Sequence, residues 1–171
     1  KVFDVVYAKN GKSPVKLAGY HALNSLRMEK GYLHWGHDIG VEENPFEAGV
    51  GFCVNLNKKN PFLGQAALEE KKKSGLSKRK VNFALSNNDL LIYHNEPIYF
   101  DGKIVGEISS GMYGFYLDKS LGMGYISNND SYSIEEMVSH QKFEIEVAET
   151  KYSAEGSINC FYDPGREKIL V

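Results

Sequence analysis

Over the first 75 residues, apolar side chains recur at the spacing of α-helices. Residues 19–30 carry them at Ala22, Leu23, Leu26 and Met28, and Gly31 then ends the pattern. Residues 64–74 predict another helix, because Glu69 and Glu70 precede three lysines, as the helix dipole favours, and Gly75 can cap the end. Residues 1–9 indicate a further helix that Asn10-Gly11 and Pro14 terminate, and residues 50–56 alternate like a half-buried strand.

From residue 76 onward the pattern changes to the period of two that is typical of strands. The alternating segments are residues 81–85, 97–100, 103–108, 143–147 and 152–158. Asp101-Gly102 between two of them is a strong hairpin signal. Short strands separated by turn residues favour a small antiparallel β-barrel. We therefore expect an α+β chain, with a helical segment and short strands over residues 1–75 and an antiparallel β-barrel domain over residues 76–171.

The composition limits the classes of function. Hydrophobic residues make up 42% of the 171 residues, which is enough for a core, and the net charge of −2 gives no reason to expect nucleic acid or a membrane surface as a partner. No apolar run approaches the roughly 20 residues of a membrane span. Cys53 and Cys160 lie far apart, which is typical of buried thiols in a reducing compartment such as the cytoplasm.

Five sequence blocks occur in an order that resembles a known family. They are Ala18–Asp38, Asn44–Val50, Pro61–Leu68, Asp101–Gly111 and Lys119–Ile126. Together they resemble the glycine-cleavage T-protein (aminomethyltransferase) family, and in particular the tetrahydrofolate-binding domain of dimethylglycine and sarcosine dehydrogenases. The resemblance implies that the chain is the C-terminal part of such a domain, with residues 1–75 as the remnant of its central, folate-binding portion.

This resemblance implies a role in one-carbon transfer. In the dehydrogenases a flavin domain oxidises an N-methyl amine, and tetrahydrofolate captures the one-carbon unit as 5,10-methylene-tetrahydrofolate. The partners would be folate, a small methylated amine and the rest of the parent polypeptide, with FAD in a separate domain. The family's catalytic acidic residues precede the segment that matches Lys1, so no catalytic residue is assigned and the isolated chain is expected to be inactive. A eukaryotic source would place the protein in the mitochondrial matrix.

Two other functions stay open. One is the aminomethyltransferase of the glycine cleavage system, although many of these enzymes carry Arg where this chain has Leu23, and Leu is usual in the dehydrogenase branch. The other is a non-catalytic regulatory or interaction domain with a degenerate cleft. The residues immediately before Lys1 would discriminate among the three.

Four residues are candidates for folate contacts. Phe52 stands where T-proteins place a Trp that lines the folate cleft, although a core position in a strand is an equally good interpretation. Arg79 and Lys80 belong to a basic run near the matching start of the barrel, where an Arg of the family helps to hold the folate tail. This run and Lys71–Lys73 would attract polyglutamate, but a solvated helix end is the default interpretation. Tyr113 belongs to a segment, residues 109–114, that in the family is a barrel turn near the cleft.

Other polar clusters are interpreted as structural. His34, His37 and Asp38 lie close together, but a zinc site needs three or four ligands and the remaining candidates are scattered, so no metal is predicted. Arg27 and Glu29 would lie about 200° apart around a helix, so they cannot pair with each other. For Arg27 and Glu29, anchoring of the helix against a neighbouring element is at least as good an interpretation as contact with a ligand.

Overall fold

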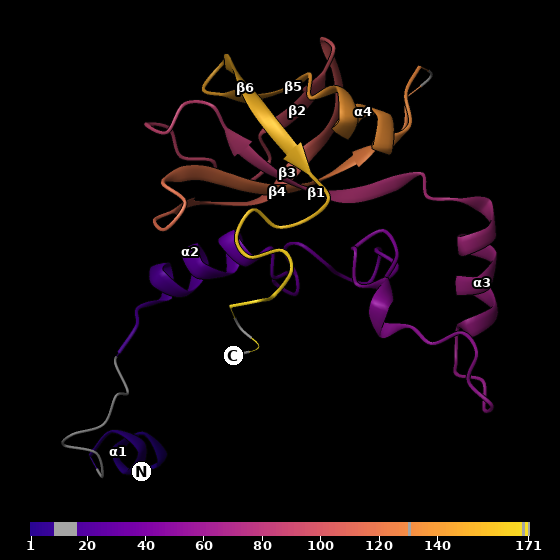
Figure 1. Cartoon of the computed structure of the whole chain (residues 1–171), viewed down its shortest axis with the longest axis horizontal. Helices are drawn as coiled ribbons and strands as arrows, with labels where there is room; N and C mark the ends of the chain where they lie inside the picture. Colours follow the sequence, from indigo (N-terminus) through magenta and orange to yellow (C-terminus); the bar gives the residue numbers. More distant parts are fainter. Residues whose placement is uncertain (9–16, 130, 169, 171) are drawn as a thin grey trace.

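Six strands close into an antiparallel barrel in a computed structural model that describes residues 1–8, 17–129, 131–168 and 170 (Figure 1). The strands are β1 (Lys78–Leu85), β2 (Pro97–Phe100), β3 (Lys103–Gly114), β4 (Lys119–Ser127), β5 (Phe143–Val147) and β6 (Thr150–Ser157). Their order around the barrel is β1-β4-β3-β2-β5-β6. The predicted α+β chain that ends in a small antiparallel barrel is confirmed.

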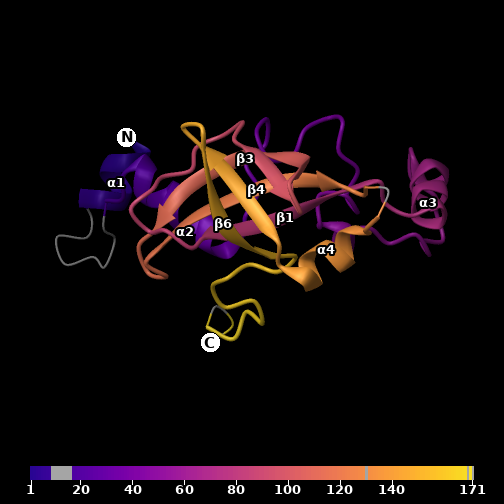
Figure 2. The same cartoon turned by 90° about the horizontal axis from the view of Figure 1, so that it is seen from above.

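The helices lie outside the barrel (Figure 2). In the described ranges they are α1 (Val2–Ala8), α2 (Tyr20–Lys30), the 3₁₀ helix η1 (Gly51–Cys53), α3 (Gln65–Ser74) and α4 (Ile134–His140). Helix α2 packs on β3 and β4, whereas α1 and α3 stand at opposite ends of the molecule. None of the described helices is long and apolar enough to cross a membrane. The predicted signals at Asn10-Gly11 and Pro14 lie outside the described residues.

The predicted helix at residues 19–30 is confirmed, but not its apolar face. Gly31 adopts a left-handed conformation (φ 65°), and its N–H bonds the carbonyls of the last turn. The residues that α2 buries against the barrel are Ser25, Met28 and Glu29, while Leu23 and Leu26 are each 59% exposed. Two of the three buried positions are polar because they hydrogen-bond the barrel, as described below.

Side chains of β1 alternate between the barrel interior and the outer surface that α2 covers, so the strand contributes to two separate clusters. Val81, Phe83 and Leu85 point into the barrel, where they join the main core. Ala84 points outward, where it packs with Met28 of α2 in a second, smaller cluster. Residues 78, 80 and 82 share this outward face, which places their side chains toward α2 and the loops that follow it.

Two local predictions are wrong. Residues 50–56 form no strand; the N–H groups of Cys53 and Val54 bond the carbonyls of Val50 and Gly51 within one tight 3₁₀ turn, so the backbone is bonded locally. The expected turn at residues 109–114 is instead the second half of β3, which pairs with β4 across a register shift between Ile108 and Ser110. For residues 50–56, the alternation of apolar and polar side chains does not produce a strand, because no described neighbouring strand is available to pair with them.

Candidate functional site

A buried carboxylate joins α2, the turn after it and the barrel. The Asp38 side chain is fully buried and accepts hydrogen bonds from Arg27 Nη1 at 2.8 Å, the His34 backbone N–H at 2.8 Å and Ser109 Oγ at 2.6 Å. Arg27 also donates to Ser110 Oγ at 3.0 Å. Arg27 is therefore engaged in holding α2 on β3, which supports the anchoring interpretation of this residue.

Glu29 anchors the same helix at a second point. Its Oε1 accepts the backbone N–H groups of Tyr116 at 2.7 Å and Leu117 at 3.1 Å, in the turn between β3 and β4. Ser25 Oγ donates to the Tyr113 carbonyl at 2.7 Å on the same side. Polar contacts of Ser25, Arg27 and Glu29 thus fix the second half of α2 on the barrel, and the loops that follow it are held against the outer face of β1.

A pocket of about 480 Å³ lies between those loops and the C-terminal segment. We call it the Phe52 pocket; residues 30–33, 48–52 and 158–166 contribute to its walls, with Lys80 from β1. Phe52 is 74% exposed, so the alternative of a core strand position is wrong. The Arg166 guanidinium carbon lies 5.4 Å from the centre of the Phe52 ring, within the range of a cation–π contact.

Lys80 brings a buried positive charge to this pocket. The side chain is on the outward face of β1, the residue is only 7% exposed, and Nζ donates to Asn82 Oδ1 at 3.1 Å. No carboxylate in the described ranges forms an ion pair with Lys80 or with Arg166. Burial lowers the pKa of Lys80 to about 8, against a smaller opposing effect of Asp38. The amine is thus mainly charged at neutral pH and has no ion-pair partner among the described carboxylates.

The other two predicted contact residues lie elsewhere. Arg79 follows the inward face of β1, opposite to Lys80, and its Nη1 pairs with Glu135 of α4 at 3.1 Å. Tyr113 donates its hydroxyl to Asp118 at the end of β3. The structure therefore brings Phe52 and Lys80 together, separates Arg79 and Tyr113 from them, and adds Arg166, which no sequence pattern had singled out.

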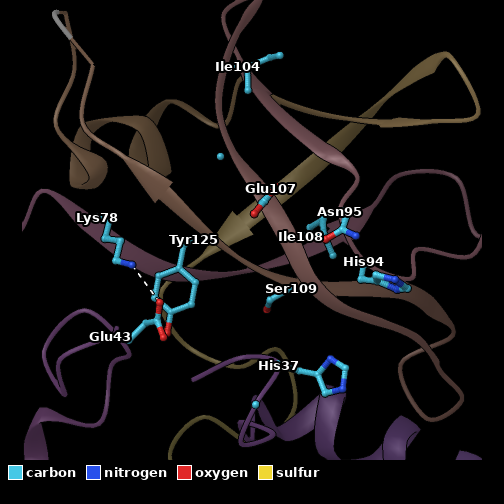
Figure 3. Close-up of a pocket in the computed structure, with 12 residues that line it drawn as sticks. His37, Glu43, Lys78, His94, Asn95, Ile104, Glu107, Ile108, Ser109 and Tyr125 are labelled. Atoms are coloured by element: carbon cyan, nitrogen blue, oxygen red, sulfur yellow. Dashed lines mark hydrogen bonds and ion pairs between the residues drawn. The ribbon is translucent and has the colours of Figure 1, made fainter. Parts of the chain in front are cut away.

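A second pocket, of about 630 Å³, lies on the outer face of β3 and β4 (Figure 3). The Lys78 amine points at Glu43 beside the Tyr125 ring, with Nζ 3.0 Å from the Glu43 carboxylate. Burial would raise the pKa of Glu43, but the hydrogen bonds from Lys78 and the Gly40 N–H lower it below its usual range. Because Glu43 neutralises Lys78, and Glu107 adds a negative charge, this Tyr125 pocket is unsuited to an anionic ligand.

The described histidines form no metal site, and the two cysteines form no disulfide. The His34 and His37 rings stack with their centres 4.9 Å apart. Within the described ranges the structure assembles no group of three His, Cys, Asp or Glu that could hold a metal ion. Both cysteines are free thiols, and the expectation that they are buried is wrong for Cys53, which is exposed on η1.

Both the barrel and the N-terminal segment of the chain match models of one protein family. Residues 78–163 match the family model of the glycine cleavage T-protein C-terminal barrel domain, which is half of the chain, and residues 1–58 match that of the GCVT N-terminal domain. The chain belongs to the glycine cleavage T-protein family. The aminomethyltransferase T of the glycine cleavage system from Bartonella henselae has the same fold, with a TM-score of 0.71 and 25% identity over 86% of this chain and 39% of that one. The resemblance inferred from the five sequence blocks is confirmed.

Among relatives of this T-protein-like chain are two amine-oxidising enzymes. The 4-methylaminobutanoate oxidase (formaldehyde-forming) of Paenarthrobacter nicotinovorans is 36% identical over 98% of the chain and 20% of its own length. The mitochondrial sarcosine dehydrogenase of Homo sapiens is 31% identical over 98% of the chain and 18% of its own length. The chain thus spans about a fifth of the length of these relatives.

Proposed function

We propose that this chain contributes part of the tetrahydrofolate site of an N-methylglycine (sarcosine or dimethylglycine) dehydrogenase-like enzyme, in which the folate accepts the one-carbon unit as 5,10-methylene-tetrahydrofolate. The Phe52 pocket is the observation that supports this most. Folate carries an aminobenzoyl ring joined to a glutamate, and the pocket offers an exposed aromatic ring beside two cations, Lys80 and Arg166, without described acidic partners.

Each of these side chains would have a positioning role. Phe52 would contact the aminobenzoyl ring, while Lys80 and Arg166 would pair with the glutamate carboxylates. Tetrahydrofolate, when bound, supplies the two nitrogen atoms that accept the one-carbon unit, so the contribution of this chain is orientation of the ligand. The methylated amine and FAD would bind other parts of the parent polypeptide. A mitochondrial relative supports a matrix location if the source is eukaryotic.

Lys80 predicts a pH dependence of folate binding. Because its pKa of about 8 lies below the ordinary 10.5, Lys80 loses its charge as the pH rises through 8. A bound carboxylate favours the charged amine, so the affinity for tetrahydrofolate is expected to be constant below that pH and to fall up to about tenfold per pH unit above it. Calorimetric titration of the intact polypeptide between pH 6.5 and 9.5 would measure this decline.

Two variants serve as controls for this titration. Lys80→Gln should bind more weakly at neutral pH and show a flat profile, because the group that titrates is gone. Lys119→Gln removes a partly exposed lysine of the barrel that pairs loosely with Glu155 at 3.8 Å, and it should retain the wild-type profile. An unchanged pH dependence in Lys80→Gln would exclude Lys80 from the site.

The fate of the methyl carbon tests the proposed function. With sarcosine or dimethylglycine and limiting tetrahydrofolate, the intact enzyme is expected to form 5,10-methylene-tetrahydrofolate. Phe52→Ala should weaken folate binding roughly two- to tenfold, which is the usual contribution of an aromatic ring contact, and should shift product toward free formaldehyde. Formaldehyde as the only product of the wild type at saturating tetrahydrofolate would contradict the proposal.

A further inference from the structure

A buried ion pair fastens the segment that follows β6 to the end of α2. Lys30, in the last turn of α2, donates Nζ to Asp163 Oδ2 at 3.1 Å and to the Asp163 carbonyl at 2.8 Å. The two side chains are only 11% and 4% exposed. Beside this pair, the Tyr162 N–H donates to the Glu29 carbonyl at 3.1 Å. Lys30 lines the Phe52 pocket, so the pair both neutralises this lysine and ties the segment to the pocket wall.

Asp163 also organises the turn that carries Arg166. The Arg166 N–H donates to the Asp163 carbonyl at 3.0 Å, and Pro164 takes the second position of this turn, where proline is favoured. Asp163 Oδ1 then accepts the Lys168 N–H at 3.3 Å. The Arg166 guanidinium carbon lies 5.4 Å from the centre of the Phe52 ring. One aspartate thus bonds the backbone both at Arg166 and just beyond it.

The backbone of Arg166 is strained. Asp163 has φ 46° and Arg166 has φ 59°, so both lie in the left-handed region although neither is glycine. Asp can offset this cost with hydrogen bonds of its short side chain, but Arg has no such local bond to make. The contacts of Asp163 therefore hold Arg166 in a conformation that it would not adopt by itself. Strain of this kind is typical of functional positions.

The far side of the turn is held by two aromatic rings. Lys168 Nζ lies 5.3 Å from the centre of the Tyr116 ring and 5.0 Å from that of the Tyr162 ring, within the range of cation–π contacts. It also donates to the Tyr116 hydroxyl at 3.3 Å. The Arg166 guanidinium, by contrast, forms no ion pair with a carboxylate in the described ranges. Lys168 is thus engaged within the protein, whereas Arg166 is presented to the pocket.

We propose that Asp163 is a positioning residue, which holds the Arg166 guanidinium beside Phe52 so that it meets the glutamate carboxylates of folate; this inference rests on the proposed function. Lys30 neutralises the Asp163 carboxylate, which would otherwise compete with the ligand for the guanidinium. The pterin and aminobenzoyl rings carry no carboxylate. The effect of Asp163 on binding is therefore confined to the glutamate part of the ligand.

The test compares tetrahydrofolate with tetrahydropteroate, which lacks the glutamate, in calorimetric titrations of the intact polypeptide. The wild type is expected to prefer tetrahydrofolate, and Arg166→Gln should reduce the preference roughly two- to fivefold, the contribution of one exposed ion pair. Lys30→Met/Asp163→Ala removes the positioning pair without changing the net charge. It should reduce the preference as much as Arg166→Gln, leave the affinity for tetrahydropteroate nearly unchanged, and add nothing further when combined with Arg166→Gln.

Two further variants make the result specific. Lys30→Met/Asp163→Asn retains an acceptor for the Lys168 N–H and a residue that tolerates positive φ, so it should fold readily and lose part of the preference. Lys142→Met/Asp101→Ala is the matched control, because Asp101 also has a positive φ of 49° and pairs with Lys142 at 3.6 Å away from the Phe52 pocket. This control should keep the full preference.

The outcomes separate this inference from the proposed function. The positioning role is overturned if the folded Lys30/Asp163 variants keep the wild-type preference, if they weaken both ligands alike, or if the Lys142/Asp101 control loses the preference equally. Equal affinity of the wild type for the two ligands would also overturn it. Failure of the wild type to bind either ligand would instead refute the proposed function.

Discussion

Replacement of Asp38 by Ala is expected to lower the free energy of unfolding by about 3–5 kcal/mol, as for other buried ion pairs that lose one partner. The Asp38 carboxylate is buried and accepts bonds from Arg27, Ser109 and the His34 N–H. Without it, a mostly buried guanidinium and two further donors are left without their acceptor. Urea unfolding of the wild type and the Asp38→Ala variant, followed by circular dichroism, would measure the difference.

The control removes an ion pair from the surface. Glu135→Ala breaks the contact between Arg79 and Glu135, whose carboxylate side chain is 67% exposed, so the expected loss is below about 1 kcal/mol. If Asp38→Ala were no more destabilising than Glu135→Ala, Asp38 could not be the group that joins α2 to the barrel.

Replacement of Gly106 by Ala is expected to disrupt the pairing of β3 with β4. A Cβ atom at this position would lie 1.8 Å from the Tyr125 carbonyl oxygen, and backbone in a closed barrel cannot move away without breaking the adjacent ladder. The expected loss of stability exceeds the roughly 1–3 kcal/mol that is usual for overpacked cores. Thermal unfolding of the variant would show a large fall in Tm or no cooperative transition.

Gly19 offers the matched substitution in open space. It precedes α2 with φ −73°, and a Cβ there meets no heavy atom within 4 Å. Gly19→Ala should therefore cost less than about 1 kcal/mol. Equal stability of the Gly106→Ala and Gly19→Ala variants would show that β3 and β4 are less closely paired at Gly106 than described.

The sequence predicted those strands that have one polar face. The hairpin of β2 and β3 followed from Asp101-Gly102 and from alternation on both sides. Strand β4 was missed because it is buried between the barrel interior and α2, so its residues, which include Gly122 and Gly124, do not alternate. Helix α4 was missed because it has seven residues, although the capping box of Ser133 and Glu136 was a readable signal.

The candidate site was predictable only in part, for reasons of geometry. Lys78, Arg79 and Lys80 are one basic run in the sequence, but the strand sends Arg79 to the opposite side from its neighbours. Lys78 shares the face of Lys80 but pairs with Glu43 at the Tyr125 pocket, so of the three only Lys80 lines the Phe52 pocket. Arg166 approaches Phe52 from more than a hundred residues away, and no periodic pattern in one sequence encodes a contact between two loops.

Hydrogen–deuterium exchange of the intact polypeptide, with and without tetrahydrofolate monoglutamate, tests the central claim most directly. A ligand in the Phe52 pocket should slow exchange in residues 48–54 and 158–166, two of the segments that line it, and leave residues 92–96 and 104–109 beside the Tyr125 pocket unchanged. Protection confined to the Tyr125 pocket, or no protection in this chain while folate binds elsewhere in the polypeptide, would contradict the assignment of the folate site to Phe52, Lys80 and Arg166.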